Sequence, residues 1–449
     1  MQSTDQPSSP APTILIRGGR VIDPASGRDE SADVALKDGR IAEIGPKLST
    51  GPADHVIDAE GLLVTPGLLD PHVHFREPGQ EHKEDLRTGS LAAVAGGFTS
   101  VCCMPNTAPA LDTPEMIRLI LSRAAEKSEC RVFPVGCGTI SRKGEALAEL
   151  GLMAEAGAIA FSDDGDAVES ADMMRRVLLA SREAGRVFMQ HCQEPSLTQG
   201  SSMHAGSVST RLGLTGWPRV AEELTLERDI RLTAALAGGP CAYHAQHLSS
   251  AGSVELIRSA RARGLPVTGE ASPHHLVITH EAVAGEDGQA YDTNAKMNPP
   301  LREQSDVDAL RQGIADGIIT ILGTDHAPHA PDEKAASFAA APFGIIGLES
   351  ALPLYAEALV ATGAIDWPRL IALLTIEPAR LCGLDARGIG SLAAGGTADV
   401  ALIDPTIEWT LTESELKGKS RNTPFLGRRL TGRVVTTIMG GRVRHEIAR

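Results

Sequence analysis

The chain has 449 residues, of which 42% are hydrophobic and 22% charged, and its formal net charge is −15. This length can hold one large domain with a minor one, and the acidic balance argues against a nucleic-acid partner. No apolar run approaches the roughly 18–20 residues of a membrane span, and no signal peptide opens the chain. The seven cysteines, an odd number, favour reduced thiols in the cytoplasm over a disulfide framework.

The two ends of the chain differ in character from its middle. Residues 1–12 are rich in Pro and Ser without apolar periodicity, which predicts a disordered tail. Residues 13–65 contain short β-like runs separated by Gly-Gly and Asp-Gly turns, and residues 385–449 repeat this style. Neither end is long enough to bury a core of its own. We therefore expect one small β-sandwich-like domain built from both ends.

The most informative motif runs from Asp70 to Gly79 and follows an apolar run that is typical of a strand entering a core. Side chains alternate between the faces of a strand, so His72 and His74 point the same way. Two imidazoles on one face can bind one divalent metal ion, and Arg76 places a cation beside it. A lone His-x-His pair is weak support for a metal site, so further ligands must come from elsewhere in the chain.

Four more strand-like runs end on residue types that bind metals. The apolar runs at 158–162, 187–190, 241–246 and 318–324 lead into Asp163-Asp164, His191, His247 and Asp325. Such residues at several strand ends predict a single metal site.

Chemistry alone leaves several ligand choices open. Either Asp163 or Asp164 could be the carboxylate ligand, and His244 could replace His247, although its place inside the strand favours packing or hydrogen bonding. A structural role is the simpler interpretation of Cys192, the His274-His275 pair and His326. Solvent exposure is the default for the histidines without partner spacing, namely His55, His82, His204, His280 and His445.

Segments with helical character separate the runs. One helix is expected from Thr113 to about Lys127, with Thr113 as N-cap and Pro114 at the first helical position, and others over roughly 171–183 and 252–263. Eight candidate strands end near His72, Met104, Gly136, Ser162, His191, His247, Glu270 and Thr324.

Apolar strands that alternate with helices indicate an α/β fold with a parallel sheet. Eight such units predict a metal-dependent (β/α)₈ TIM-type barrel over residues 66–384, with its active site at the C-terminal ends of the strands. A doubly wound open sheet is the structural alternative, but it would not easily bring five strand ends to one point.

Five segments carry a resemblance to a known family. They are residues 72–79, 104–107, 296–302, 324–329 and 341–344. Together they resemble dihydroorotase, of the longer bacterial type in the amidohydrolase superfamily, in order and with family-like spacing from about Ile14 to Gly441. The first and fourth segments alone mark the superfamily, whereas the Phe-Arg-Glu-Pro-Gly and Asn-Pro-Pro-Leu-Arg stretches make the combination more specific.

The resemblance implies the reversible conversion of N-carbamoyl-L-aspartate to (S)-dihydroorotate and water, in the de novo synthesis of pyrimidines, with two zinc ions per subunit. The implied metal ligands are His72, His74, Asp164, His191, His247 and Asp325. The first two histidines would hold one metal and the second two the other.

Asp164 would bridge the metals, with Asp163 as a hydrogen-bonding partner nearby, and Asp325 would also act as general base and acid. Many members of the superfamily bridge two metals with a carboxylated lysine, but no lysine occupies this strand end. Because Asp reaches less far, we expect a different metal spacing or a weaker second site.

The substrate would be bound by a polar frame around the metals. Arg76 can bind the substrate carboxylate in a bidentate manner that a lysine could not match. The full set of expected substrate contacts is His74, Arg76, Asn106, Asn298, His329, Phe343 and Gly344. Residues 331–341, which directly follow the catalytic strand end, are a candidate lid.

Two other functions remain open. An allantoinase- or hydantoinase-type cyclic amidase is less consistent with Arg76 and with the segment that ends at Arg302, because a plain hydantoin ring needs no such cation. A non-catalytic scaffold for aspartate carbamoyltransferase is less consistent with the complete set of ligand types. A homo-oligomer is expected in either case, and aspartate carbamoyltransferase is a candidate partner for the active enzyme too.

Overall fold

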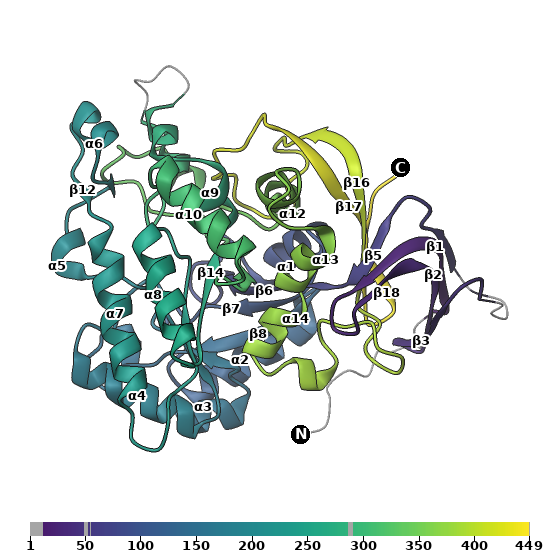
Figure 1. The fold of residues 1–449 in the computed structure, drawn as a ribbon, viewed down its shortest axis with the longest axis horizontal. Helices are drawn as coiled ribbons and strands as arrows, with labels where there is room; N and C mark the ends of the chain where they lie inside the picture. The colour runs from purple at the N-terminus through teal and green to yellow at the C-terminus, as the bar shows by residue number, and fades with distance from the viewer. Residues whose placement is uncertain (1–11, 49–52, 54, 286–290, 449) are drawn as a thin grey trace.

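The structure is a computed structural model that describes residues 12–48, 53, 55–285 and 291–448 (Figure 1). The predicted tail over residues 1–12 therefore lies, except for Pro12, outside the described residues. The described residues form two eight-stranded sheets, one parallel and one mixed. A separate, third sheet has two parallel strands.

The parallel sheet is the predicted barrel, and its strands follow one another in chain order. They are β6 (Leu68–Val73), β7 (Phe98–Cys103), β8 (Arg131–Gly136), β9 (Ala160–Phe161), β10 (Val187–Gln190), β13 (Tyr243–Ala245), β14 (Val267–Ala271) and β15 (Ile321–Leu322). A parallel bridge between Val73 and His326 joins the first strand to the segment after the last one. The open-sheet alternative is therefore wrong, and the predicted (β/α)₈ fold class is confirmed.

Helices connect successive strands and cover the barrel (Figure 1). The main ones are α1 (Leu86–Ala95), α2 (Pro114–Lys127), α3 (Leu150–Ala156), α4 (Ala171–Glu183), α7 (Val220–Ala234), α8 (Ala251–Ala262) and α10 (Gln304–Ala315). The expected bounds of α2 and α4 are confirmed, and Thr113 caps α2 by accepting a hydrogen bond from the amide of Met116. Helix α8 starts one residue earlier than predicted, because the Ser250 hydroxyl caps it by accepting from the amide of Ser253 at 3.1 Å.

Shorter elements occupy the connections. Those after β10 are α5 (Pro195–Thr198), β11 (Met203–His204), α6 (Ser207–Leu212) and β12 (Gly216–Trp217). Those after β14 are α9 (Pro273–Val277) and two 3₁₀ turns at His280–Ala284 and Thr293–Ala295. Beyond β15 lie α11 (Pro331–Lys334), α12 (Ala351–Tyr355), a π turn (Ala356–Val360), α13 (Trp367–Leu373) and α14 (Ile376–Leu381). Two further 3₁₀ turns lie at Ile140–Arg142 and Asp385–Arg387.

An apolar plug closes the barrel at the end where the strands begin. Residues early in three strands, Leu69, Phe133 and Val187, share one buried cluster with Leu384 and Ile389 from the segment after α14. The side chains of this cluster are removed from water almost completely. We call the opposite end, where the strands finish and where this fold carries its active sites, the open end of the barrel.

The second sheet combines strands from both chain ends, which lie side by side beyond the barrel in Figure 1. Its order is β18-β17-β16-β5-β1-β2-β3, with β4 paired to β1. The strands are β1 (Ile14–Asp23), β2 (Arg28–Lys37), β3 (Arg40–Gly45), β4 (His55–Asp58), β5 (Leu63–Pro66), β16 (Val400–Thr410), β17 (Arg429–Met439) and β18 (Arg442–Glu446). Its buried cluster draws on both ends, for example on Ile16, Val34, Val400 and Ile438.

Two further features bear on the setting of the protein. Within the described chain, no helix is both long and apolar enough to cross a membrane. The seven cysteines all lie in described segments, and every one is a buried free thiol.

Candidate metal centre

The first two histidines of the site come from the end of β6. His72 lies within the strand and His74 directly beyond it, so the alternation of the strand turns both side chains to the same side. The backbone is fixed on both residues, since the amide of His72 donates to Asp70 Oδ1 at 3.0 Å and that of His74 to the carbonyl of His326 at 2.9 Å. Both side chains are buried.

Asp164 lies between two pairs of histidines. Its Oδ2 atom is 3.6 Å from His72 Nε2 and 3.4 Å from His74 Nε2. Its Oδ1 atom is 3.4 Å from His191 Nδ1 and 3.5 Å from His247 Nε2. Each carboxylate oxygen therefore faces one histidine pair, which is the arrangement that a bridging ligand needs.

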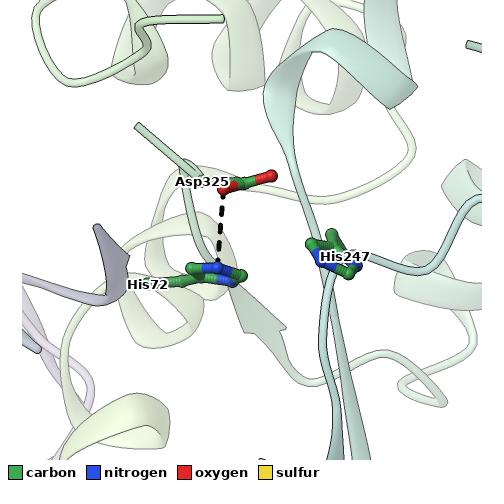
Figure 2. Close-up of side chains that lie close together, drawn as sticks. All are labelled: His72, His247 and Asp325. Carbon is green, nitrogen blue, oxygen red and sulfur yellow. Dashed lines mark ion pairs between the residues drawn. The ribbon is translucent and has the colours of Figure 1, made fainter. Parts of the chain in front are cut away.

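Asp325 completes the cluster from the end of the last strand. Its Oδ1 is 2.9 Å from His74 Nε2 and 3.5 Å from His72 Nε2, the pair marked by the dashed line in Figure 2. Figure 2 also shows that His247 approaches from a separate strand end. Asp325 and His247 both have positive φ angles, +47° and +30°, which non-glycine residues rarely adopt. Backbone strain of this kind collects where a site demands a side-chain direction.

The donor set fits a divalent metal. The six residues form three overlapping groups whose ligand atoms lie within 4.8 Å of one another: His72, His74 and Asp164; Asp164, His191 and His247; and His72, His247 and Asp325. Asp164 Oδ1 is buried and has no hydrogen-bond partner among the described residues. An unpartnered buried carboxylate oxygen is costly, so a cation between the imidazoles would satisfy it.

Charge reinforces this fit. Burial by itself raises the pKa of Asp325, but the charge on His72 and the hydrogen bond with His74 outweigh it and lower that pKa to about 2. Burial also opposes ionisation of Asp164, yet the charge on His72 and the nearby imidazoles of His191 and His247 hold its pKa well below the usual value. Both carboxylates are therefore ionised, which is the state that a metal ion requires of its carboxylate ligands.

Each of three histidines uses its outer ring nitrogen for a second contact. His72 Nδ1 lies 2.6 Å from Glu270 Oε1, His74 Nδ1 2.8 Å from Asn106 Oδ1, and His191 Nε2 2.9 Å from Gln193 Oε1. In each case the other nitrogen faces Asp164. Such outer contacts fix ring orientation and tautomer in metal sites.

The expected substrate contacts gather beside the cluster. Arg76, with φ of +60°, is buried, and its Nε donates to the carbonyl of Pro328 at 3.1 Å while an Nη lies 3.5 Å from His329 Nε2. Burial lowers the pKa of Arg76 to about 10, so it stays a cation at neutral pH. His329 Nε2 also contacts the carbonyl of Phe343 at 2.8 Å.

The amide side chains lie one step further out. Asn298 donates to Gln193 Oε1 at 2.9 Å and is thereby linked to His191, as Asn106 is to His74. Gly344 has φ of +149°, and a Cβ atom there would lie 2.7 Å from the carbonyl of Ala327. Any larger residue at position 344 would clash with the backbone of Ala327, so the close approach of these two segments requires glycine.

The alternative metal ligands considered from the sequence make other contacts in the structure. Asp163 turns away from the cluster and accepts from the amides of Gly138 and Thr139 at 2.9 and 3.1 Å, so Asp164 alone faces the histidines. His244 contacts Thr268 and Glu270 instead of the cluster.

Three more alternatives show the same pattern. Cys192 Sγ lies 3.4 Å from the hydroxyl of Tyr243, and His275 Nε2 donates to the carbonyl of Pro299 at 3.0 Å. His326 Nδ1 accepts from the amide of Gly347 at 3.2 Å.

Two expectations about other residues are wrong. His204 and His280 are buried rather than exposed, because the segments after β10 and β14 fold against each other there. Arg302, which we expected to favour a carboxylate-bearing ring, is buried, and it donates from Nε to Ser249 Oγ at 3.0 Å and lies 3.2 Å from His204 Nδ1. Its cation therefore holds loops together and is not aimed at the metal cluster.

Three contributors to the site escaped the sequence interpretation. Glu270 was recognised only as a strand end, although a carboxylate at that position of a barrel is itself a signal. Gln193 lies two residues after His191, on the same side of an extended segment, which could have drawn attention to it. Asn422 gave no local signal: it accepts from the amide of His329 at 3.0 Å and donates to the carbonyls of Ala327 and Gly344.

The candidate lid, residues 331–341, is anchored by two buried lysines. Lys296 Nζ donates to the carbonyls of Phe338, Ala339 and Ala341 at 2.7–3.0 Å. Lys334 Nζ donates to the carbonyls of Thr293 and Pro342 at 2.8 and 2.9 Å. These contacts hold the segment next to Phe343.

Comparisons with known proteins agree with this geometry. A family model described as Dihydro-orotase-like matches residues 61–253. The dihydroorotase of Geobacter sp. (strain M21) is 46% identical over 433 residues, which cover 96% of this chain and 99% of that protein. The dihydroorotase of Geotalea daltonii is 48% identical over 434 residues, with 96% and 99% coverage.

Among solved structures, the L-hydantoinase (dihydropyrimidinase) of Arthrobacter aurescens superposes with a TM-score of 0.86 at 25% identity and covers 98% of this chain and 97% of that one. The barrel with a separate sheet from the chain ends is thus shared with cyclic amidases. The sequence relatives are much closer than this structural one and match over nearly their full length. The chain belongs to the dihydroorotase family.

Proposed function

We propose that this protein is a zinc-dependent cyclic amidohydrolase that interconverts N-carbamoyl-L-aspartate and (S)-dihydroorotate in pyrimidine (UMP) synthesis. The observation that carries the proposal is the position of Asp164, with one oxygen toward each histidine pair, and of Arg76 beside them. The full-length identity to dihydroorotases supports the choice of substrate.

Two zinc ions per subunit would be held by the six residues of the cluster. His72, His74 and Asp325 surround one position, and His191 and His247 the other. Asp164 would be shared between them. When bound, zinc activates a water molecule near neutral pH and polarises the amide carbonyl.

Asp325 is the proposed acid and base. Its Oδ1 contacts His74 and its pKa is low, so the carboxylate is free of a proton before reaction. In ring opening it would take a proton from the attacking water and deliver it to the ring nitrogen as the C–N bond breaks. Ring closure runs the same transfers in reverse and releases water.

The chain orients the substrate through its polar frame. Arg76 would bind the carboxylate of the ring, and its contacts with Pro328 and His329 fix the guanidinium in advance. The proposed remaining contacts are His74, Asn106, Asn298, His329, Phe343 and Gly344. Asn106 already contacts His74 through its side-chain oxygen, and Asn298 donates to Gln193, whose oxygen contacts His191.

A hydantoinase-type activity is the second candidate, because a hydantoinase shares the fold over almost the whole chain. The two differ in whether the ring carries a carboxylate, which the buried Arg76 cation would bind. Since Arg302 turns elsewhere, this discrimination would rest on Arg76.

The test is ring opening by the purified, zinc-loaded protein with dihydroorotate, hydantoin and allantoin as substrates, and with Asp325→Ala as control. We expect turnover of dihydroorotate alone, abolished in the variant. A preference for hydantoin or allantoin would overturn the proposed substrate. Absence of turnover on all three would call for counting bound zinc and for adding the partner enzyme.

The setting of the reaction belongs to the same proposal. Seven buried free thiols suit the reducing cytoplasm. Association with aspartate carbamoyltransferase and assembly into a homo-oligomer stay predictions, which analytical ultracentrifugation of the protein alone and of the mixture would check.

A further inference from the structure

Glu270 is a buried carboxylate at the end of β14 that the proposed mechanism does not use. It is 1% exposed and has three donors at hydrogen-bonding distance. Oε1 lies 2.6 Å from His72 Nδ1 and accepts from the amide of His247 at 3.2 Å, and Oε2 lies 3.1 Å from His244 Nε2. The carboxylate therefore contacts two of the implied metal ligands.

The direction of these hydrogen bonds is fixed by chemistry. An ionised carboxylate can only accept, so His72 must donate from Nδ1 and His244 from Nε2. Because Nδ1 is held as a donor to Glu270, Nε2 is the nitrogen of His72 that remains on the side of Asp164 and Asp325, where a metal ion would bind.

Gly323 on the neighbouring strand end packs closely against the Glu270 carboxylate. A Cβ atom at Gly323, at the end of β15, would lie 2.9 Å from Glu270 Oε2 and 3.4 Å from His72 Cβ. His244 Nδ1 in turn lies 2.8 Å from Thr268 Oγ1, on the neighbouring strand. The half-buried Thr268 and the buried His244, Glu270 and His72 thus form a hydrogen-bonded chain that ends at the cluster.

The two sides of the cluster differ in this respect. The outer nitrogen of His191 faces Gln193 Oε1, a neutral amide, at 2.9 Å, whereas that of His72 faces a carboxylate at 2.6 Å. Hydrogen bonds to a charged acceptor are shorter and roughly twice as strong as those to a neutral one. A carboxylate also makes the ligand nitrogen more basic, and loss of such a partner typically costs about 10–100-fold in metal affinity.

We propose that Glu270 is a positioning residue that locks His72 in the tautomer and orientation for metal binding and makes the His72 side the tighter of the two metal positions. The inference rests on the proposed two-metal function. It goes beyond that function because it assigns a stronger effect on metal affinity to Glu270, which contacts His72, than to Gln193, which contacts His191.

The experiment measures zinc binding to the full-length apoprotein by competition with a chromophoric chelator, and metal content by mass spectrometry. The variants are Glu270→Gln, Gln193→Ala and Glu84→Gln. Glu84 is equally buried and accepts from the amide of Lys419 at 3.1 Å, so it reports the general cost of removing a buried carboxylate. Thermal melting of each apoprotein checks that it is folded.

We expect Glu270→Gln to weaken the tighter zinc position by roughly 10–100-fold, Gln193→Ala to weaken mainly the other position, and Glu84→Gln to leave both unchanged. A far-downfield imidazole N–H resonance of the apoprotein should disappear in Glu270→Gln and persist in Glu84→Gln. His244→Gln, which leaves Glu270 in place, should cause a smaller loss of affinity.

Equal zinc affinities in wild type and Glu270→Gln, with both folded, would overturn the inference while leaving the proposed function intact. Equal losses in Glu270→Gln and Glu84→Gln would also overturn it, because the effect would then be one of general stability. A wild-type protein that binds no zinc would instead overturn the proposed function itself.

Discussion

The two ends of the barrel differ in the side chains that they bury. At the end where the strands finish, the six candidate metal ligands are buried together, and Arg76, His247 and Asp325 have positive φ angles. At the end where the strands begin, Leu69, Phe133, Leu384 and their neighbours form a continuous apolar cluster. The comparison indicates that the plugged end stabilises the barrel and thereby tolerates strain and buried charge at the open end.

Asp325→Asn, at the open end, should have the largest effect on catalysis. The amide keeps the shape but cannot accept the proton, so we expect kcat for dihydroorotate to fall roughly 10⁴-fold, about 5.5 kcal/mol in barrier. Because the amide fills the same space among the histidines, we expect the variant to stay folded, which thermal melting checks. A fall of kcat below tenfold would contradict the assigned role.

At the plugged end, Leu384→Ala should have the opposite profile. Leu384 is 1% exposed, and its truncation leaves a cavity that costs roughly 2–5 kcal/mol in free energy of unfolding. We expect kcat and KM to stay near wild type. Leu381→Ala, at the half-buried last residue of α14, is the matched control and should cost less. Denaturant titration measures both, and a large loss of kcat in Leu384→Ala would break the comparison.

Arg76→Lys is a milder change at the open end. It keeps the cation but loses the planar fork that can hold a carboxylate with two hydrogen bonds. We expect KM for dihydroorotate to rise roughly 10–100-fold, about 1.4–2.7 kcal/mol, with a smaller effect on kcat. Steady-state kinetics check this. Unchanged KM would show that another group binds the carboxylate.

The smallest expected effect concerns acid stability near the open end. Burial lowers the pKa of His275 to about 4, whereas the unfolded chain has a value near 6.5. Between pH 4 and 6.5 the unfolded state binds one more proton than the native state, so this group makes stability fall as pH falls, by at most about 1.4 kcal/mol per pH unit. In His275→Gln the pH dependence of the denaturation midpoint should be shallower over that window. An identical slope in both proteins would refute the assignment.

Much of the fold could be predicted because the relevant signals are local. The eight barrel strands are short apolar runs bounded by turns, and α2 and α4 carry N-caps, Thr113 and Ser170, that mark their starts. The six candidate ligands lie at the ends of five strand-like runs, and parallel strands bring such ends together. The choice of Asp164 over Asp163 came only from the family resemblance.

What could not be predicted depends on contacts between distant residues. The burial of His204 follows from its approach to His280 and Arg302, neither of which is near it in sequence. Asn422 supports the site from 93 positions beyond its partner His329. Glu270 contacts His72 from 198 positions away, and although its place at a strand end was a signal, that partner could not be inferred from the local sequence.

The mixed sheet has a consequence for how the protein is made. Strand β5 pairs with β16, and Thr65 donates a hydrogen bond to Ala401 from 336 positions away. A ribosome that adds about 5–20 residues per second therefore needs roughly 17–70 seconds to supply the partner of β5. During that time β1 and β2 can pair as a hairpin, but the apolar edge of β5 stays uncovered. Strand β16, one of the last to leave the ribosome, thus covers the edge of β5, one of the early strands. A chain cut short before β16 would expose this sheet edge to aggregation.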